Sequence, residues 1–260
     1  MLFRSTGIDH LVIAVRDLEG AVASYTELGF TVVPGGRHTG IGTYNALIAF
    51  EDGSYIELIG FYEPRPDHRW WAALEKGGGL VDFCLQTDDL AGDTLAFRKA
   101  GVDIGDPEPK SRLRPDGYQV RWVFSLARGS HRGVAPFIIQ DETPREERIP
   151  REMTHPNGVT GIGTLTVAVD DVPTAGDWYT QVLGRPGAGT VSATLQGAGT
   201  RFLIGPHTLD LLTPDGRRGP LGQWLETRGS SPYLATLTSR ARGSGLLPES
   251  KTCGARLLVE

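Results

Sequence analysis

One pattern occurs three times along the chain, and it limits the possible folds more than any other feature. The segments 7–18, 79–90 and 161–172 superpose without gaps, as GIDHLVIAVRDL, GLVDFCLQTDDL and GIGTLTVAVDDV. Each starts at glycine, continues through an alternating or fully apolar stretch and reaches aspartate just before its last residue, which is typical of a strand that leads into a helix. Internal repetition of this kind predicts a fold built from copies of one unit.

The residues after each repeat complete that unit. A helix is expected to start after an aspartate, because a short carboxylate accepts the free amides of a first turn, and to end at a glycine, which tolerates a left-handed backbone. These helices lie between Asp17 and Gly29, Asp89 and Gly101, and Asp171 and Gly184. Three strands are expected after each helix, at 30–33, 45–50 and 54–61, at 102–104, 118–126 and 134–140, and at 191–195, 201–204 and 208–213. The unit is therefore βαβββ.

The copies define the expected organisation of the chain. A partial fourth copy is indicated at 233–238 and 255–259, and the charged, proline-bearing stretch 141–156 is the expected domain boundary. A short helix near Trp70 has a counterpart at 217–228. We predict an α+β fold of tandem βαβββ modules forming two paired, cupped, mixed β-sheets. The module pair 1–145 carries the site, and 158–260 is a degenerate, structural pair.

Bulk properties exclude several classes of partner. The net charge is −5 without a long basic run, which argues against nucleic acid. No apolar run approaches the roughly 18 residues of a membrane span, and the N-terminus lacks a signal-peptide core. The two cysteines are far apart, as expected of a reduced, intracellular protein. We predict a cytoplasmic monomer or homodimer whose partner is a small molecule.

Two polar residues stand on strands of the first module. His10 shares a strand face with Val12 and Ala14, and Glu57 lies between two apolar residues. An unpaired buried carboxylate is costly, so Glu57 needs a metal ion, an arginine or a proton. Taken alone, either residue is better explained by a core position than by a site, but the repeat makes them a pair on the first and fourth strands of one unit with a predicted common face.

The glycine-rich connection between these strands carries other polar candidates. Thr43, Asn45 and His38 either form a surface turn or line the site, and His38 is the spare general acid or base because its ordinary pKa is near neutrality. Arg121 alternates with Trp122 on a strand, where it belongs to a solvated charge run or contacts an anionic substrate group. The other arginines beside the same turn, at 112 and 114, belong to the same solvated charge run or, with Lys110, form a small basic cluster suited to one anionic ligand.

A tandem βαβββ unit with histidine on its first strand and Ile-Glu-Leu on its fourth resembles the vicinal oxygen chelate superfamily of glyoxalases, extradiol dioxygenases, fosfomycin-resistance enzymes and bleomycin-binding proteins. Within it, GGRHTGIGTYNALIAFEDGSYIEL, SRLRPDGYQVRW and APFIIQD resemble the glyoxalase-like domain family. The resemblance implies that two modules enclose a cup whose metal ligands come from first and fourth strands. The matching positions are His10, Glu57, Asp82 and Phe137, of which the last cannot ligate.

The function implied by this resemblance is a metal-dependent lyase, isomerase or hydrolase that acts on a small oxygenated molecule. His10, Glu57 and Asp82 would hold a divalent ion (Zn, Ni, Mn, Mg or Fe), and Glu57 or His38 would move the proton. Expected substrate contacts are Thr43, Asn45, Trp70, Arg121, Trp122 and Phe137. Two alternatives stay open: a non-catalytic sequestering or resistance protein, and a metal-free enzyme with His10 and Glu57 as an acid–base pair. An extradiol dioxygenase is disfavoured, because the second histidine position reads Asp82.

Overall fold

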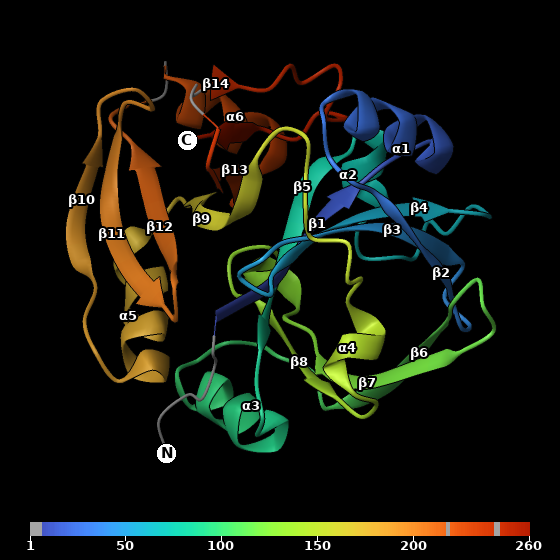
Figure 1. Cartoon of the computed structure of the whole chain (residues 1–260). Helices are drawn as coiled ribbons and strands as arrows, with labels where there is room; N and C mark the ends of the chain where they lie inside the picture. Colours follow the sequence, from blue (N-terminus) through green and yellow to red (C-terminus); the bar gives the residue numbers. More distant parts are fainter. Residues whose placement is uncertain (1–6, 217–218, 242–244) are drawn as a thin grey trace.

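The first half of the molecule is a closed eight-stranded β-barrel in the order β1-β4-β3-β2-β6-β7-β8-β5 (Figure 1). The structure is a computed structural model that describes residues 7–216, 219–241 and 245–260. The barrel strands are β1 (Gly7–Ala14), β2 (Val33–His38), β3 (Thr43–Ala49), β4 (Tyr55–Phe61), β5 (Gly79–Gln86), β6 (Glu108–Leu113), β7 (Gln119–Ser125) and β8 (Phe137–Asp141). The accompanying helices are α1 (Leu18–Glu27), α2 (Trp71–Glu75), α3 (Leu90–Lys99), the 3₁₀ turn η1 (Gly129–His131) and α4 (Arg145–Arg148).

The second half is a seven-stranded sheet in the order β10-β11-β12-β9-β13-β15-β14. Its strands are β9 (Val159–Ala168), β10 (Ala188–Ser192), β11 (Gly197–Ile204), β12 (His207–Pro214), β13 (Ser231–Ser239), β14 (Gly245–Leu246) and β15 (Leu257–Val259). The helices are α5 (Val172–Leu183) and α6 (Pro220–Arg228). Residues 217 and 218, where the second short helix was expected to begin, lie outside the described residues. In Figure 1, α5 lies beside β10, β11 and β12.

Strand register confirms the tandem βαβββ fold. In the first module β1 runs parallel to β4 and Val12 pairs with Glu57, while in the second β5 runs parallel to β8 and Cys84 pairs with Phe137. The third module repeats this with Thr166 opposite Asp210. The first strands of neighbouring modules also pair antiparallel in both halves, as β1 with β5 and β9 with β13. Phe137 therefore occupies the position equivalent to Glu57.

The predicted helix ends are confirmed by the backbone. Asp89 and Asp171 are N-caps whose carboxylates accept the amides of Gly92 and Thr174, and Asp17 occupies the same position without a side-chain bond. Helix α5 ends at Gly184 with φ of 67°, a left-handed conformation that favours glycine.

Three of the strand assignments expected from the sequence were wrong. The stretch expected to be a glycine-rich connection is β2 and the start of β3, so Arg37 and His38 lie on a strand that pairs with both β3 and β6. Strand β6 was missed, because its residues are mostly polar and give no apolar alternation. The segment 102–104, predicted as a strand, contributes only an isolated bridge from Ile104 to Ala127.

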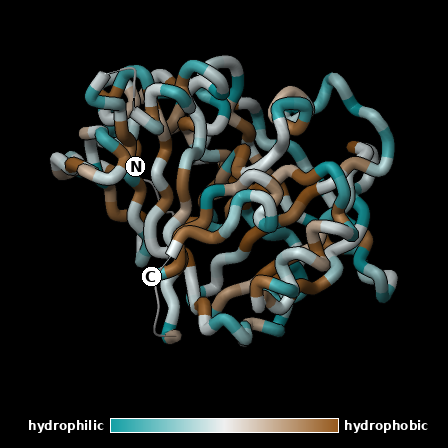
Figure 2. Tube along the Cα trace, turned by 90° about the horizontal axis from the view of Figure 1, so that it is seen from above, coloured by the Kyte–Doolittle hydropathy of each residue, from teal (hydrophilic) through white to brown (hydrophobic). Residues whose placement is uncertain are grey.

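The hydrophobic core crosses both halves. One cluster of buried residues extends from Ile8 in β1 to Leu257 in β15. In Figure 2 the hydrophobic stretches follow many of the interior strands, and hydrophilic ones are frequent in the outer turns. The division at 141–156 stays a prediction, and α4 in that segment packs into the end of the barrel through Arg148.

The face of the second sheet that corresponds to the barrel interior is filled by protein. Leu221 and Trp224 of α6 pack against Leu212 and Tyr233 on this face. Asp210, the equivalent of Glu57, accepts two hydrogen bonds from Arg201, from Nε at 2.7 Å and from Nη2 at 2.6 Å. Among the described residues no arginine pairs with Glu57 in this way, and Glu57 lines an open space inside the barrel.

Candidate functional site

A cavity of about 80 Å³ lies inside the barrel. Such a volume holds only a few water-sized groups, so its ligand is small or must move a side chain. Its walls combine titratable groups with aromatic rings, and the principal lining residues are His10, His38, Asn45, Tyr55, Glu57, Trp70, Arg112, Trp122, Phe137 and Arg148. Seven of the predicted site residues are among these, and we call the space the barrel cavity.

His10 enters the cavity with a fixed orientation. Its Nδ1 lies 2.6 Å from Oδ1 of Asp9, and its ring stacks on Tyr55 with centroids 4.5 Å apart. Because Asp9 is ionised and can only accept, Nδ1 carries a hydrogen and donates it, and Nε2 is the ring nitrogen that faces the cavity. That atom faces Oε2 of Glu57 at 3.7 Å.

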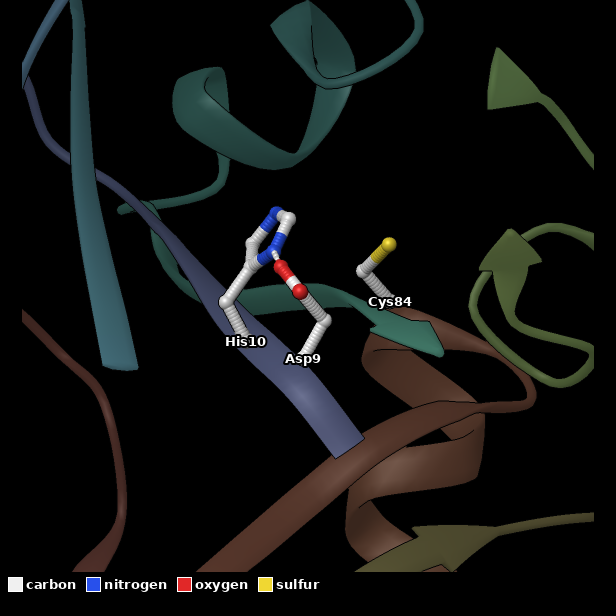
Figure 3. Close-up of side chains that lie close together, drawn as sticks. All are labelled: Asp9, His10 and Cys84. Carbon is white, nitrogen blue, oxygen red and sulfur yellow. Dashed lines mark hydrogen bonds and ion pairs between the residues drawn. The ribbon is translucent and has the colours of Figure 1, made fainter. Parts of the chain in front are cut away.

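A β-bulge explains how Asp9 and His10, which are adjacent in sequence, lie on the same side of strand β1. Strands β1 and β5 shift register between Ile8 and His10, and Asp9 is the extra residue. Regular alternation would send Asp9 and His10 to opposite faces. Figure 3 shows the Asp9 carboxylate turned to the imidazole instead, with Cys84 on the adjacent strand.

Asp9 is held by two arginines of α4. Arg148 donates to both of its oxygens at 2.8 Å, and Arg145 donates to Oδ2. Burial alone would raise the pKa of Asp9, but the charge and hydrogen bonds of Arg148 override it and hold this pKa well below its usual range. The carboxylate that orients His10 therefore stays ionised.

His38 and Glu57 complete a row of three titratable groups. Nε2 of His38 lies 3.6 Å from Oε1 of Glu57, and Nδ1 lies 3.0 Å from the hydroxyl of Thr43. Burial lowers the pKa of His38 to about 4, against a smaller opposing effect of Glu57, so the imidazole is neutral at neutral pH. Asn45 donates to Oε1 of Glu57 at 2.6 Å.

Arg112 lies behind Asn45 and is buried, which corrects its assignment to a solvated charge run. Its Nη1 donates to Oδ1 of Asn45 at 3.3 Å and its Nη2 donates to the carbonyl of Arg148 at 2.9 Å. Burial lowers the pKa of this guanidinium, while Tyr55 and Glu57 oppose that shift. The cavity therefore holds a buried cation next to Glu57.

Three predicted site residues lie elsewhere. Asp82 is buried behind the wall, where it accepts from Nε1 of Trp70 at 2.9 Å and lies 2.7 Å from Nη2 of Arg69. Arg121 points outward with its side chain 58% exposed, and its nearest ion-pair partner is Glu142 at 3.9 Å. Thr43 is fully buried and contacts His38 rather than the cavity.

Asp9, Tyr55 and Arg148 were missed from the sequence, whereas Arg112 was noted there only as part of a charge run or of a small basic cluster. Only Asp9 left a signal, as a charged residue inside an apolar strand that must find a cation. The others gave none, because Arg148 reaches Asp9 across 139 residues of chain.

Two groups of side chains offer metal ligands. Asp9, His10 and Cys84 have ligand atoms within 4.8 Å of one another. However, both oxygens of Asp9 already bind arginine, and burial raises the pKa of Cys84 well above its usual value, so the thiol keeps its proton. His10, His38 and Glu57 form a second group, in which each imidazole directs Nε2 toward Glu57 while its Nδ1 contacts an orienting side chain, but their ligand atoms do not all lie within 4.8 Å of one another.

The barrel of paired βαβββ modules, with histidines and a carboxylate in its interior, is the arrangement of a vicinal oxygen chelate protein. Residues 8–183 match the model of the family described as glyoxalase-like domain, and the chain belongs to that family. The expected family and fold are thereby confirmed. A comparison with curated proteins gave no match.

Similarity to solved structures extends over nearly the whole chain at low sequence identity. A hypothetical protein from Staphylococcus aureus aligns with a TM-score of 0.70 and 16% identity, over 97% of this chain and 98% of that one. A mutant of 4-hydroxymandelate synthase from Streptomyces coelicolor aligns at 0.67 and 16%, over 95% and 78%. A xylose isomerase-like TIM barrel/4-hydroxyphenylpyruvate dioxygenase fusion protein aligns at 0.53 and 17%, over 95% and 40%. These similarities establish the shared fold.

Among the described residues, none of the helices is both long and apolar enough to cross a membrane.

Proposed function

We propose that this protein is a metal-dependent enzyme that acts on a small oxygenated molecule in the barrel cavity. The observation that carries the proposal is the row His10–Glu57–His38, in which two imidazole Nε2 atoms face one carboxylate at 3.7 and 3.6 Å. All three side chains are buried, and the two Nδ1 atoms are engaged by Asp9 and Thr43. Oriented imidazoles beside a carboxylate are typical ligands of divalent transition metals.

The proposal changes the metal ligands expected from the sequence. His10 and Glu57 are kept, and His38 takes the place of Asp82, whose carboxylate is committed to Trp70 and Arg69. A bound divalent ion would supply Lewis-acid polarisation of the substrate oxygens. Two nitrogens and a carboxylate suit Zn, Ni, Mn or Fe better than Mg, which prefers oxygen ligands.

The protein's own groups would handle the proton. Glu57 is the preferred base, because Asn45 occupies Oε1 and leaves Oε2 as the oxygen that can receive a proton. His38 is a second acceptor, since burial keeps it neutral. Around them Trp122 and Phe137 exclude water and strengthen electrostatic interactions within the cavity.

The experiment is a metal analysis of protein purified without chelator, with His10→Ala, His38→Ala and Glu57→Gln beside the wild type. We expect about one divalent ion per wild-type chain and loss in each variant, while Asp82→Asn keeps the ion and serves as the matched control. Wild-type protein without metal that neither binds nor is stabilised by added Zn, Ni, Mn or Fe would contradict the proposal.

A non-catalytic binding protein is the second candidate. It is favoured by Phe137 at the position equivalent to Glu57, and by the rings of Tyr55, Trp70 and Trp122 around the cavity. A binder needs shape and stacking rather than a metal. If His10→Ala keeps the affinity for a bound small molecule and no metal is found, this candidate replaces the enzyme.

A further inference from the structure

Arg112 is a buried cation that lacks a carboxylate partner. Its residue exposure is 3%, and no carboxylate oxygen of the described residues lies within 4.0 Å of its guanidinium nitrogens. Toward the described part of the chain, only two of the five N–H groups of the guanidinium are donated, one to Asn45 and one to the carbonyl of Arg148. Buried charges in proteins are normally paired, so this arrangement is incomplete as it stands.

The neighbouring buried arginine shows the usual solution. Arg148, with the same 3% exposure, is paired to carboxylates on two sides, through Asp9 at 2.8 Å and through Asp141. Arg112 has only neutral oxygens, although Glu57 is nearby, because Asn45 stands between them and binds both. The barrel thus neutralises one arginine and leaves the other facing the cavity.

The backbone leaves room for this arrangement. Gly35 of β2 packs so closely on the Asn45–Arg112 contact that an added Cβ would collide with Oδ1 of Asn45 and Nη1 of Arg112. The guanidinium is also reachable, because Arg112 lines both the barrel cavity and an outer cleft of about 610 Å³ at the end of the barrel. A glycine is therefore required where the arginine approaches Asn45.

We propose that Arg112 binds the carboxylate of the substrate, and that the substrate class is a small carboxylic acid with an oxygen on the neighbouring carbon, as in 2-hydroxy and 2-oxo acids. A carboxylate would accept from the free N–H groups of Arg112 in the forked geometry that guanidinium favours. The 2-oxygen would then be directed toward Glu57 and His38, which face the same cavity. The position of this second oxygen rests on the proposed function, whereas the anion site does not.

The test is a binding comparison between acids and their amides on metal-free protein. Glycolate, lactate and pyruvate are titrated against glycolamide, lactamide and pyruvamide, with protein-detected NMR as the readout. We expect the wild type to bind each acid about 10- to 100-fold more tightly than its amide, as for a charge-assisted pair. Arg112→Met should remove this preference without weakening amide binding, and Gly35→Ala should reduce it by displacing the guanidinium.

The control is Arg121→Met, which removes an exposed arginine of the same barrel and should leave the preference intact. If Arg112→Met does not fold, the wild-type protein still tests the inference, because the inference requires that it bind each acid more tightly than the matching amide. Three results would overturn the inference. The wild type binds acids and amides with equal affinity, it binds no acid up to tens of millimolar, or Arg112→Met keeps the preference for acids. An acid preference in a protein that never binds metal would support the anion site while contradicting the metal proposal.

Discussion

Asn45 donates to Oε1 of Glu57 over 2.6 Å, and the same side chain accepts from Arg112 through its oxygen. One neutral amide thereby lies between a carboxylate and a guanidinium and binds both. Its orientation follows from its partners, since only its nitrogen can donate to Glu57 and only its oxygen can accept from Arg112. Asn45 therefore keeps both charged groups available to a ligand.

Asn45→Ala tests this role. The substitution leaves a buried carboxylate oxygen and a buried N–H group without a partner, and we expect a loss of about 1–3 kcal/mol in the free energy of unfolding. Urea denaturation measures it. Gln119→Ala, which removes an exposed amide on β7, should change stability by less than about 0.5 kcal/mol. Equal effects of the two variants would show that the Asn45 contacts are not needed for folding.

Arg148→Met tests the ion pair that anchors α4 to the barrel. It leaves Asp9 buried with only Arg145 as counter-ion, and we expect a loss of about 3–5 kcal/mol in urea denaturation. The double variant with Asp9→Asn should be more stable than Arg148→Met alone, because the fully buried carboxylate is then uncharged and Asp141, which is partly exposed, keeps Arg145 as a counter-ion.

The matched control is Lys251→Met, which breaks an exposed pair with Glu27 and should cost no more than about 1 kcal/mol. If the loss in the free energy of unfolding of the double variant equals the sum of the losses in the two single variants, Asp9 and Arg148 do not stabilise each other.

The repeat predicted the architecture because strands, caps and glycines recur at fixed offsets, and these signals are local. The same offset predicts that Asp82 on β5 is equivalent to His10 on β1. The pairing of these strands agrees, since His10 lies opposite Cys84 and Asp82 lies opposite Val12. The side chain of Asp82 nevertheless binds Trp70 and Arg69. Equivalent backbone positions do not fix side-chain partners.

The other site residues are placed by contacts between segments that are distant in sequence, and local sequence patterns do not indicate such contacts. His38 was expected in a loop because two glycines precede Arg37, whereas β2 is stabilised by pairing with β3 and β6. The bulge at Asp9 breaks the period of two on which strand faces are assigned. Arg112 and Arg148 lie in polar stretches, and only tertiary packing buries them.

Cys84→Ala distinguishes the two candidate metal sites. We expect the variant to keep the metal content of the wild type, because burial raises the pKa of this thiol and its neighbour Asp9 is bound by arginine. Glu57→Gln, by contrast, should lower it. Elemental analysis of the purified variants gives the result. Loss of the ion in Cys84→Ala with retention in Glu57→Gln would assign the metal to Asp9, His10 and Cys84.

The last prediction concerns His155, which links the connecting segment to the barrel. Its Nδ1 accepts from the amide of Thr31 at 3.0 Å, so its Nε2, 2.9 Å from the carbonyl of Ala49, must donate. This pattern needs the neutral ring, and burial, opposed by the bond to Ala49, lowers the pKa of His155 below its usual value of 6.5.

A lowered histidine pKa means that the unfolded chain takes up the proton first, so stability rises with pH in this range. We expect the free energy of unfolding to fall as pH decreases from about 6.5 toward the folded-state pKa of His155, where the loss ends. Urea denaturation between pH 7 and 5 measures the slope, and His155→Gln should make it shallower. His131→Gln, at a partly exposed histidine of η1, is the control. If the slope in His155→Gln equals that of the wild type, the neutral His155 contact does not contribute to the pH dependence.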